Sequence, residues 1–296
     1  MLTCILRLTL YLVFILAASF FVAFELTSSL APLVLFPGFP NISSDGLELK
    51  KSHTYEPIII SDSIREGIIE THQGNSLHYV EIMPMQHIAE VDNDGKPIKN
   101  ADTLVFYLHG NGFSLDTLWR QVAIDLSKQT NMPVVTYDYT GYGRSSSNIF
   151  DVNAVVDDAM FLLQKSMVAL GATTVVLYGR SIGAAVAIHL AQRLRRMKGL
   201  KVVLETPMLG TKHLRCWLGV SVFCSEKFDC RLCLQDTSHL PLLVRLAGKD
   251  LIINNDSVIE LLKTWRRDSV QVCIEHNTGH NNMSQTKWNT SLLDFL

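Results

Sequence analysis

Short apolar runs alternate with longer amphipathic stretches through most of the chain after residue 100. Continuous apolar runs bounded by polar turns are typical of parallel strands buried on both faces, and the longer stretches have the period of helices packed against them. The expected strands are 103–108, 133–138, 174–178, 201–204, 242–247 and 269–275, and the expected helices are 115–129, 152–170, 182–197, 256–265 and 287–296. This order predicts an α/β fold with helices on both faces of a mostly parallel sheet.

The segment before this region has a different pattern. Residues 64–71 and 76–83 are two expected strands joined by Gln73-Gly74-Asn75, a sequence typical of a hairpin turn. A hairpin followed by βα alternation predicts one mixed sheet.

The first apolar segment has another pattern, because Leu8 to Phe24 contains no charged residue and lies between Arg7 and Glu25. Its length is near the lower limit of about 17–25 residues for a membrane-spanning helix and exceeds a signal-peptide core of about 7–15. We favour an uncleaved signal anchor, and a removed signal peptide with a secreted product is the alternative. The positive-inside rule, applied to Arg7, places the domain that follows on the non-cytoplasmic side.

The composition of successive segments divides the chain into three parts. We assign 1–30 to the anchor or signal with its flank, 31–60 to a linker and 61–296 to one domain, because 48% hydrophobic residues suffice for a large core. The net charge of −2 and the lack of a dense basic stripe argue against a nucleic-acid partner.

The alternation of strands and helices breaks down at about 206–240, and we interpret this segment as an insertion over the strand ends. It contains three aromatic residues, Trp217, Phe223 and Phe228, and four cysteines, Cys216, Cys224, Cys230 and Cys233. The cysteines would pair in an exported domain, and reduced, partly buried thiols are the alternative. A structural zinc site is disfavoured because two paired C-x-x-C knuckles are lacking, so we expect no metal.

The strongest local signal is Gly179-Arg180-Ser181-Ile182-Gly183, which follows an apolar strand and precedes an Ala-rich helix. A serine in a sharp strand-to-helix turn needs glycines beside it, since Cβ atoms there would collide with the strand and helix. The context predicts that Ser181 is a nucleophile.

A serine nucleophile needs a base and an acid that orients the base. Asp250 follows the strand 242–247 and His280 follows the strand 269–275, so both are expected at the carboxyl edge of the sheet, in the order serine, acid, histidine. The less favoured alternatives are His276 as base and Glu205 as acid. Asp256 fits a helix cap or first-turn residue better.

The developing oxyanion needs backbone N–H donors. We expect one from Ile182 and the second from the glycine-rich turn after the strand 103–108, with Asn111 the first choice and Gly112 the second. His109, just before them, fits a structural role better than that of a second base.

Five motifs in order resemble the α/β-hydrolase superfamily: Tyr107–Gly112, Tyr137–Ser145, Gly179–Gly183, Gly248–Asp250 and Gly279–Asn282. In particular, the chain is similar to membrane-associated serine hydrolases of the α/β-hydrolase-domain-containing 13 and 17 type. The resemblance implies an α/β-hydrolase fold with Ser181 as nucleophile, Asp250 as acid and His280 as base. It implies a structural role for the second motif, in which Asp138 and Arg144 brace a turn. The cysteine-rich segment departs from the family's pattern.

Together these features predict a membrane-anchored serine hydrolase that needs no cofactor and cleaves acyl esters or thioesters, with lipid-like acyl groups favoured. Its partners would be an acyl-bearing small molecule, lipid or acylated protein, and the membrane through the N-terminal helix. An amidase or peptidase, an acyltransferase on the same triad, and a non-catalytic binding protein on a hydrolase scaffold are the alternatives.

Overall fold

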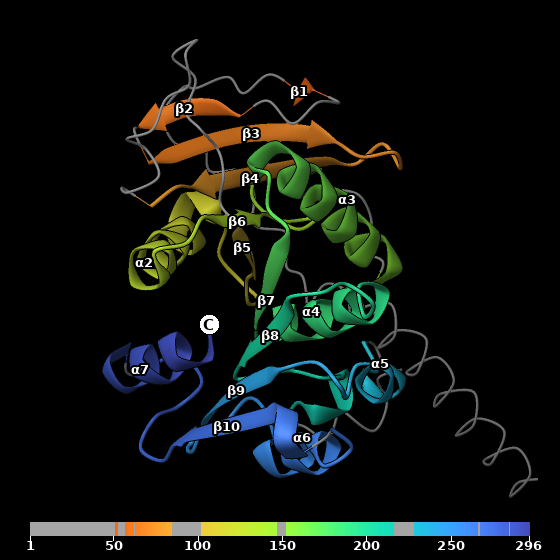
Figure 1. The fold of residues 1–296 in the computed structure, drawn as a ribbon, viewed down its shortest axis with the longest axis vertical. Coiled ribbons are helices and arrows are strands. Elements are labelled where there is room, and N and C mark those ends of the chain that lie inside the picture. The colour runs from red at the N-terminus through yellow and green to blue at the C-terminus, as the bar shows by residue number, and fades with distance from the viewer. Residues whose placement is uncertain are drawn as a thin grey trace, which may run out of the picture.

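One mixed β-sheet organises the part of the chain that the computed structural model describes, which is residues 51–52, 57–61, 63–84, 102–146, 152–215, 228–265, 267–283 and 285–296. The strand order is β1-β3-β4-β6-β5-β7-β8-β9-β10 (Figure 1). Strand β2 stands outside this order and pairs with β3. Pairing is antiparallel among β2, β3, β4 and β6 and parallel from β6 through β10. The predicted mixed, mostly parallel sheet is therefore confirmed.

The strands are β1 (Lys51–Ser52), β2 (Ile58–Ser61), β3 (Ile64–Glu70), β4 (Ser76–Ile82), β5 (Thr103–Leu108), β6 (Val134–Tyr137), β7 (Thr174–Arg180), β8 (Leu200–Glu205), β9 (Leu242–Ala247) and β10 (Val270–Glu275). The α-helices are α2 (Arg120–Thr130), α3 (Val152–Leu170), α4 (Ile182–Arg193), α5 (Arg231–Asp236), α6 (Asn255–Leu262) and α7 (Gln285–Phe295). Shorter helical turns are η2 (Leu115–Trp119), η3 (Thr211–His213) and η5 (Arg267–Ser269).

Side chains that alternate along the central strands build two hydrophobic cores, one on each face of the sheet. In β5, Leu104, Phe106 and Leu108 point into the larger core, and Val105 and Tyr107 point into the smaller one. Because successive side chains of a strand face opposite sides, an unbroken apolar strand needs helices on both faces.

The helices supply that cover. Residues of α3, α4 and α6 pack into the larger core, and residues of α2 and α7 pack into the smaller one. Figure 1 shows α3, α4 and α6 on one side of the sheet and α2 and α7 on the other. The helix layers thus hold the central strands rigidly from both sides.

Parallel register brings several strand ends to one edge. Leu108 of β5 pairs with Gly179 of β7, and Arg180 pairs with Glu205 at the end of β8. On the far side, Ala247 of β9 pairs with Glu275 of β10. Loops after these strands therefore leave the sheet side by side, which is where α/β sheets place their ligand sites.

The structure differs from the predicted elements in three places. Helix α4 ends at Arg193 rather than at 197, because the chain leaves the helical conformation at Leu194 and turns through Gly199, whose φ is +74°. Helix α5 lies inside the segment expected to be irregular, and its six residues are too few to show a helical period. Strand β1 and all but the last residue of strand β2 fall in the range assigned to the linker.

No helix of the described residues is both long and apolar enough to cross a bilayer. The predicted anchor, Leu8–Phe24, lies outside those residues. Cys216, Trp217, Phe223 and Cys224 of the predicted insertion lie outside them as well.

Candidate active site

Ser181 occupies a strained turn between β7 and α4. Its φ of 52° and ψ of −116° belong to a region that residues with a side chain rarely adopt. Its N–H donates to the Glu205 carbonyl at 2.9 Å, which fixes the turn to the end of β8. Such conformations persist only where the surroundings enforce them, and they concentrate at functional sites.

The glycines on either side of Ser181 make this turn possible. A Cβ at Gly179 would lie 2.5 Å from the Gly183 carbonyl oxygen, and a Cβ at Gly183 would lie 2.1 Å from the Leu108 carbonyl oxygen. Both distances are far below van der Waals contact and involve backbone atoms that cannot move independently. The predicted need for glycine therefore arises from close approach of β7, α4 and β5.

Three predicted residues meet at this edge. His280 Nε2 lies 3.1 Å from Ser181 Oγ, and His280 Nδ1 lies 2.7 Å from Asp250 Oδ2. Asp250 follows β9 and His280 follows β10, so segments separated by 99 and 30 residues are joined by two hydrogen bonds. The acid, the imidazole and the hydroxyl thus form one hydrogen-bonded chain that ends at Ser181 Oγ, the arrangement of a serine nucleophile with its base and orienting acid.

Asp250 is held as a carboxylate by its contacts. Its Oδ1 accepts the N–H groups of Ile252 and Ile253 at 2.8 Å each. Burial alone would raise the pKa of Asp250, but the hydrogen bonds from His280 and from these two amides hold it below its ordinary value of 3.8. The ionised acid can therefore orient His280 across the neutral pH range.

The alternative residues lie elsewhere. His276 is exposed, and its backbone packs against Gly248. Glu205 accepts the Tyr178 hydroxyl at 2.6 Å and lies 3.5 Å from Arg245, so it contacts neighbours other than His280. Asp256 lies in the first turn of α6, where Asn254 provides the cap.

The loop after β5 passes directly beside the serine. A Cβ at Gly110 would lie 3.5 Å from Ser181 Cβ. Within the loop, Gly112 donates its N–H to Asn111 Oδ1 at 2.9 Å and has a φ of +72°. Trp119 donates its indole N–H to the Gly112 carbonyl at 2.8 Å. We call residues 109–113 the oxyanion loop, after the role that the sequence predicts for Asn111; Gly110 brings this loop next to Ser181.

His109, the first residue of this loop, is fully buried. Its Nδ1 lies 2.8 Å from the Gly110 carbonyl, and its ring stacks on Trp119 with centroids 5.4 Å apart. Burial lowers the pKa of His109, so the ring is neutral near pH 7. Tyr139 donates its hydroxyl to the His109 carbonyl at 2.8 Å and supports the loop from below.

A second buried histidine, His78, organises a charged cluster on the antiparallel side of the sheet. His78 Nε2 lies 2.6 Å from Glu66 and Nδ1 lies 3.1 Å from Asp138, with no part of the residue exposed. Burial alone would lower the pKa of His78, but hydrogen bonds and charge from Asp138 and Glu66 raise it above 6.5. The ring is thus held as a cation between two carboxylates.

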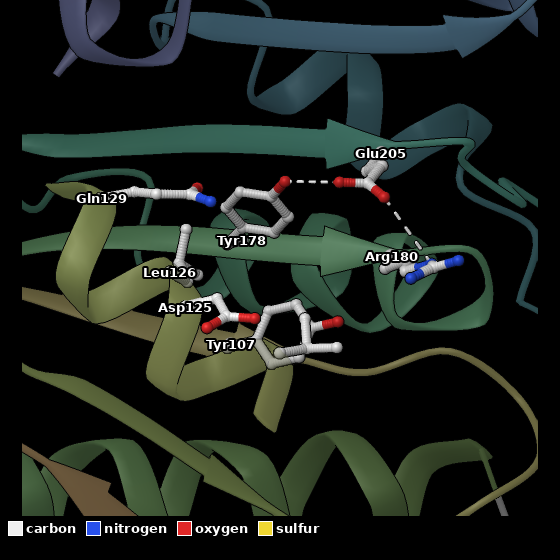
Figure 2. Close-up of a pocket in the computed structure, with 8 residues that line it drawn as sticks. Tyr107, Asp125, Leu126, Gln129, Tyr178, Arg180 and Glu205 are labelled. Atoms are coloured by element: carbon white, nitrogen blue, oxygen red, sulfur yellow. Dashed lines mark hydrogen bonds and ion pairs between the residues drawn. The ribbon is translucent and has the colours of Figure 1, made fainter. Parts of the chain in front are cut away.

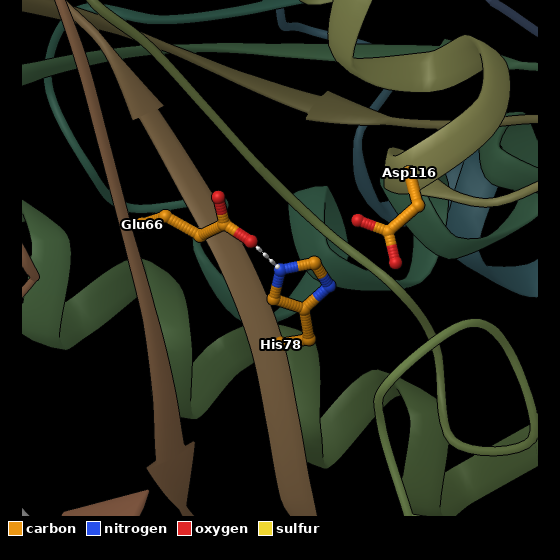
Figure 3. A group of neighbouring side chains, drawn as sticks. All are labelled: Glu66, His78 and Asp116. Carbon is orange, nitrogen blue, oxygen red and sulfur yellow. Dashed lines mark hydrogen bonds and ion pairs between the residues drawn. The ribbon is translucent and has the colours of Figure 1, made fainter. Parts of the chain in front are cut away.

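Two arginines complete this cluster. Arg144 contacts Asp116 with two nitrogens, each at 2.9 Å, and Glu66 at 3.2 Å, while Arg120 lies 2.9 Å from Glu66. Glu66, His78 and Asp116 offer ligand atoms within 4.8 Å of one another, the spacing of a metal site (Figure 3). Because the arginines neutralise both carboxylates, we interpret the group as a structural ion network.

The motif 137–145 packs against this network. Ser145 donates its hydroxyl to the Asp138 carbonyl at 2.5 Å, and Asp138 Oδ1 accepts the Leu115 N–H at 2.9 Å. Asp138 and Arg144 hold the turn, as the resemblance implied, but they do so through His78 and Asp116 rather than through each other.

The described cysteines of the predicted insertion are buried. Cys233 is a free thiol whose Sγ lies 3.3 Å from His189 Nδ1, and burial raises its pKa to about 11. Cys230 Sγ lies 3.3 Å from the Phe228 carbonyl, and Phe228 is only 2% exposed. These residues belong to the larger core.

The structure adds three side chains that the sequence did not single out. Arg180 lies over the Trp119 ring, and Tyr142 donates its hydroxyl to Asn111 Oδ1 in the oxyanion loop. Arg180 and Tyr142 both lie inside motifs recognised from the sequence, which give neither side chain a role of its own. Trp119 carried no signal beyond an apolar helical position.

Comparison with known proteins identifies relatives of this fold. A profile described as the Alpha/beta hydrolase family matches residues 105–282, more than half of the chain. The human Alpha/beta hydrolase domain-containing protein 17B is 25% identical over 187 residues, covering 62% of each chain. The Caenorhabditis elegans protein aho-3 is 32% identical over 134 residues, covering 45% of this chain and 39% of its own. The chain thus matches less than two thirds of the length of these relatives.

Solved structures have the same architecture at lower identity. An esterase of Pyrococcus furiosus, Pf2001, superposes with a TM-score of 0.62 and 16% identity, covering 85% of this chain and 98% of its own. DcsB in complex with a substrate analogue superposes with a TM-score of 0.60 and 12% identity, covering 79% of this chain and 98% of its own. At these identities the likeness establishes the fold alone, and the expected similarity to the domain-containing 17 type rests on the sequence matches.

Proposed function

Since the chain belongs to the alpha/beta hydrolase family, we propose that it is a serine hydrolase that cleaves acyl esters or thioesters through an acyl-enzyme. The observation that carries the proposal is the continuous hydrogen-bonded path from Asp250 through His280 to Ser181, with distances of 2.7 and 3.1 Å. The strained conformation of Ser181 supports it independently, because it is enforced by three neighbouring segments.

The proposed reaction begins at Ser181 Oγ. His280 Nε2 accepts the serine proton as Oγ attacks the acyl carbonyl carbon, and the Asp250 carboxylate stabilises the imidazolium. His280 then donates that proton to the departing alcohol or thiol. A water molecule, deprotonated by the same nitrogen, attacks the acyl-enzyme, and the returned proton regenerates Ser181 and releases the acid.

Two backbone amides are proposed to hold the oxyanion. Ile182 starts α4, so its N–H is one of the unpaired donors at the helix N-terminus. Asn111 is the preferred second donor, because the Gly112 N–H is already engaged by Asn111 Oδ1 at 2.9 Å. Removing a donor of this kind lowers kcat by about 10²–10³-fold in serine proteases.

Lipid-like acyl groups remain the favoured substrates. Phe113, the last residue of the oxyanion loop, is 57% exposed, and Leu251, directly after Asp250, is 79% exposed. Both follow strands that end at the catalytic edge, so apolar surface is available there for an acyl chain. Phe228, in contrast, is buried and offers no such surface. Anchoring through residues 8–24 is proposed with this function.

A fluorophosphonate probe tests the proposal directly. We expect rapid covalent labelling of the wild type and none of Ser181→Ala, with equal circular dichroism spectra for the two proteins. The absence of labelling in folded wild type would favour the non-catalytic binding alternative. Hydrolysis of an ester and thioester series from acetyl to palmitoyl would then define the acyl preference, and equal turnover of all lengths would contradict it.

Added acceptors and amide substrates distinguish the remaining alternatives. Formation of a transfer product with an alcohol or amine acceptor would identify an acyltransferase. Faster cleavage of an amide than of the matched ester would identify an amidase or peptidase.

A further inference from the structure

Arg180 is the last residue of β7 and directly precedes Ser181, and its side chain is mostly buried, with 15% exposed. It extends towards the face of the sheet that carries α2, where it lines a small cavity with Leu126 and Gln129. Figure 2 shows the guanidinium at the end of β7, with the Glu205 carboxylate directed towards it. The contacts of this guanidinium show which segments around Ser181 it connects.

One contact of Arg180 is with the support of the oxyanion loop. Its guanidinium carbon lies 5.3 Å from the centroid of the Trp119 ring, within the range of a cation–π interaction. The same indole donates its N–H to the Gly112 carbonyl at 2.8 Å. Arg180 therefore restrains the tryptophan on which the loop carrying Asn111 rests.

Another contact reaches the loop of the catalytic histidine. Arg180 Nη2 donates to Asn281 Oδ1 at 3.4 Å, and Asn281 directly follows His280. Asn282 braces the same loop, because its Oδ1 accepts the Gly279 N–H at 2.5 Å. The guanidinium thus links the segment after β10 to the segment after β7.

A third contact fixes the guanidinium itself. Arg180 Nε lies 3.7 Å from Glu205 Oε1, and Glu205 Oε2 accepts the Tyr178 hydroxyl at 2.6 Å. Arg245, which is fully buried, joins Glu205 at 3.5 Å to Glu275 at the end of β10. Glu205 also accepts the Ser181 N–H through its backbone carbonyl. The carboxylate is therefore a fixed anchor for Arg180.

We propose that Arg180 is a positioning residue that ties the oxyanion loop and the His280 loop to the nucleophile turn. The inference rests on the proposed serine hydrolase function. The three groups of the reaction come from loops after β5, β7 and β10, and displacements of about 1 Å in such a site can cost 10²-fold in rate. A planar guanidinium can stack on Trp119 while donating sideways to Asn281, and a lysine ammonium cannot do both.

Removal of the side chain should therefore change the chemical step more than binding. We expect Arg180→Met to lower kcat on a soluble ester by about 30- to 100-fold with KM within about twofold, as for lost positioning. Arg180→Lys should recover part of the loss through its charge beside Glu205. The matched control is Arg193→Met at the other end of α4, where the arginine pairs with Asp157 at the surface; its kcat should equal that of the wild type.

A double-mutant cycle tests the route through Asn281, which is exposed and can be changed without disturbing the core. Asn281→Ala should lower kcat by about 3- to 10-fold, and the double variant with Arg180→Met should be little worse than Arg180→Met alone. Additive effects of the two changes would show that Arg180 does not act through the histidine loop and would overturn the proposal.

Chemical rescue provides a second readout. Arg180 lines a cavity of about 70 Å³ together with Tyr107, Tyr178 and Glu205 from the sheet and residues of α2. In Arg180→Ala this space would be enlarged, so methylguanidine should restore part of kcat. It should have no effect on Asn281→Ala or Ser181→Ala. Lack of rescue, together with a kcat for Arg180→Met within threefold of wild type, would overturn the proposal.

Two outcomes separate this inference from the function it rests on. If the fluorophosphonate probe does not label the wild type, the hydrolase proposal fails. If it labels wild type and Arg180→Met at the same rate, only the positioning role fails. Should Arg180→Met not fold, Arg180→Lys and Asn281→Ala decide the question, and additive effects of that pair would overturn it.

Discussion

Two of the buried histidines, His280 and His78, form hydrogen bonds with carboxylates, and they differ in what faces the second ring nitrogen. His280 has Asp250 on one nitrogen and the Ser181 hydroxyl on the other. His78 has a carboxylate on each, Asp138 and Glu66. A hydroxyl can give up a proton to the ring, whereas a second carboxylate holds the ring in its protonated form.

Their surroundings strengthen that difference. The side chain of His280 is 8% exposed and lies at the edge where the parallel strands end, while His78 is fully enclosed and its carboxylates contact Arg120 or the backbone. The comparison teaches that pairing with a carboxylate does not mark a catalytic histidine. What matters is whether one nitrogen remains available to exchange a proton with a reactive group.

The sharpest test of this contrast is His280→Gln. Loss of the base should reduce kcat/KM by about 10⁴-fold or more, as for removal of a triad member. Because the residue lies at an open edge, the free energy of unfolding should change by less than about 2 kcal/mol. Ester hydrolysis and urea denaturation measure the two quantities. A variant that retained a tenth of wild-type activity would refute the assignment of His280 as base.

The reverse pattern is expected for His78→Gln. Removing the cation leaves Glu66 and Asp138 partly uncompensated in the interior, and breaking a buried pair costs about 3–5 kcal/mol. Activity per folded molecule should stay within about tenfold of wild type. The control is Arg193→Ala, which breaks a surface pair worth about 1 kcal/mol or less. Equal midpoints of urea denaturation for the two variants would contradict a structural role for His78.

The meeting of Ser181, Asp250 and His280 at one edge of the sheet was more predictable from the sequence than the charged cluster. Gly179 and Gly183 reveal the turn because no other residue fits, and strand ends in a parallel sheet converge whatever their separation along the chain. Asp250 and His280 could therefore be named from their places after two strands. The fold's hairpin and alternating strands were predicted for the same reason, since their periodicity is local.

The charged cluster could not be predicted, because its members are brought together by tertiary pairing. Glu66 and His78 meet only through the antiparallel register of β3 and β4, and Arg144 joins them from a loop 66 residues further on. Arg180 shows the same limit within a recognised motif, because its contacts with Trp119 and Asn281 have no sequence signature. The length of α4 was overestimated because Leu194, Arg195, Arg196 and Met197, which follow its end, all have high helix propensity.

The pH dependence of stability sharpens the contrast further. Because the pKa of His78 is raised, its stabilisation is complete below the unfolded value of about 6.5 and declines as the pH rises towards and through the folded value. Above pH 6.5 we therefore expect stability to fall as the pH rises, until the pH has passed the folded-state pKa of His78, with a slope from this one group of at most about 1.4 kcal/mol per pH unit. His109 and His189 have lowered pKa values, so their contributions change below pH 6.5 instead.

Urea denaturation at half-unit steps from pH 6 to 8 measures this slope, and His78→Gln should abolish it. The lowered pKa values of Asp250 and Glu66 act on the acid side, where their stabilisation is present above the unfolded values near 4 and is lost as the pH falls further. If the free energy of unfolding of His78→Gln still fell by the same amount between pH 6 and 8, the pH dependence would come from another group.

The smallest expected effect comes from the bond that joins the two regions. Tyr142 belongs to the motif packed against the His78 cluster, and its hydroxyl donates to Asn111 Oδ1 in the oxyanion loop. Burial raises its pKa, so the hydroxyl remains protonated and the bond persists at every working pH. Tyr142→Phe should cost about 1 kcal/mol of stability and lower kcat by about 3- to 10-fold, because the loop loses one restraint while its backbone donors remain.

The matched control is Tyr137→Phe, since Tyr137 lies in the same motif but donates its hydroxyl to the Val155 carbonyl of α3 at 3.4 Å. That variant should lose a similar amount of stability or less and keep wild-type kcat. If both phenylalanine variants retained full kcat, the structural cluster would stabilise the fold without influencing the oxyanion loop. If only Tyr142→Phe were slowed, the cluster and the catalytic edge would be coupled through this one side chain.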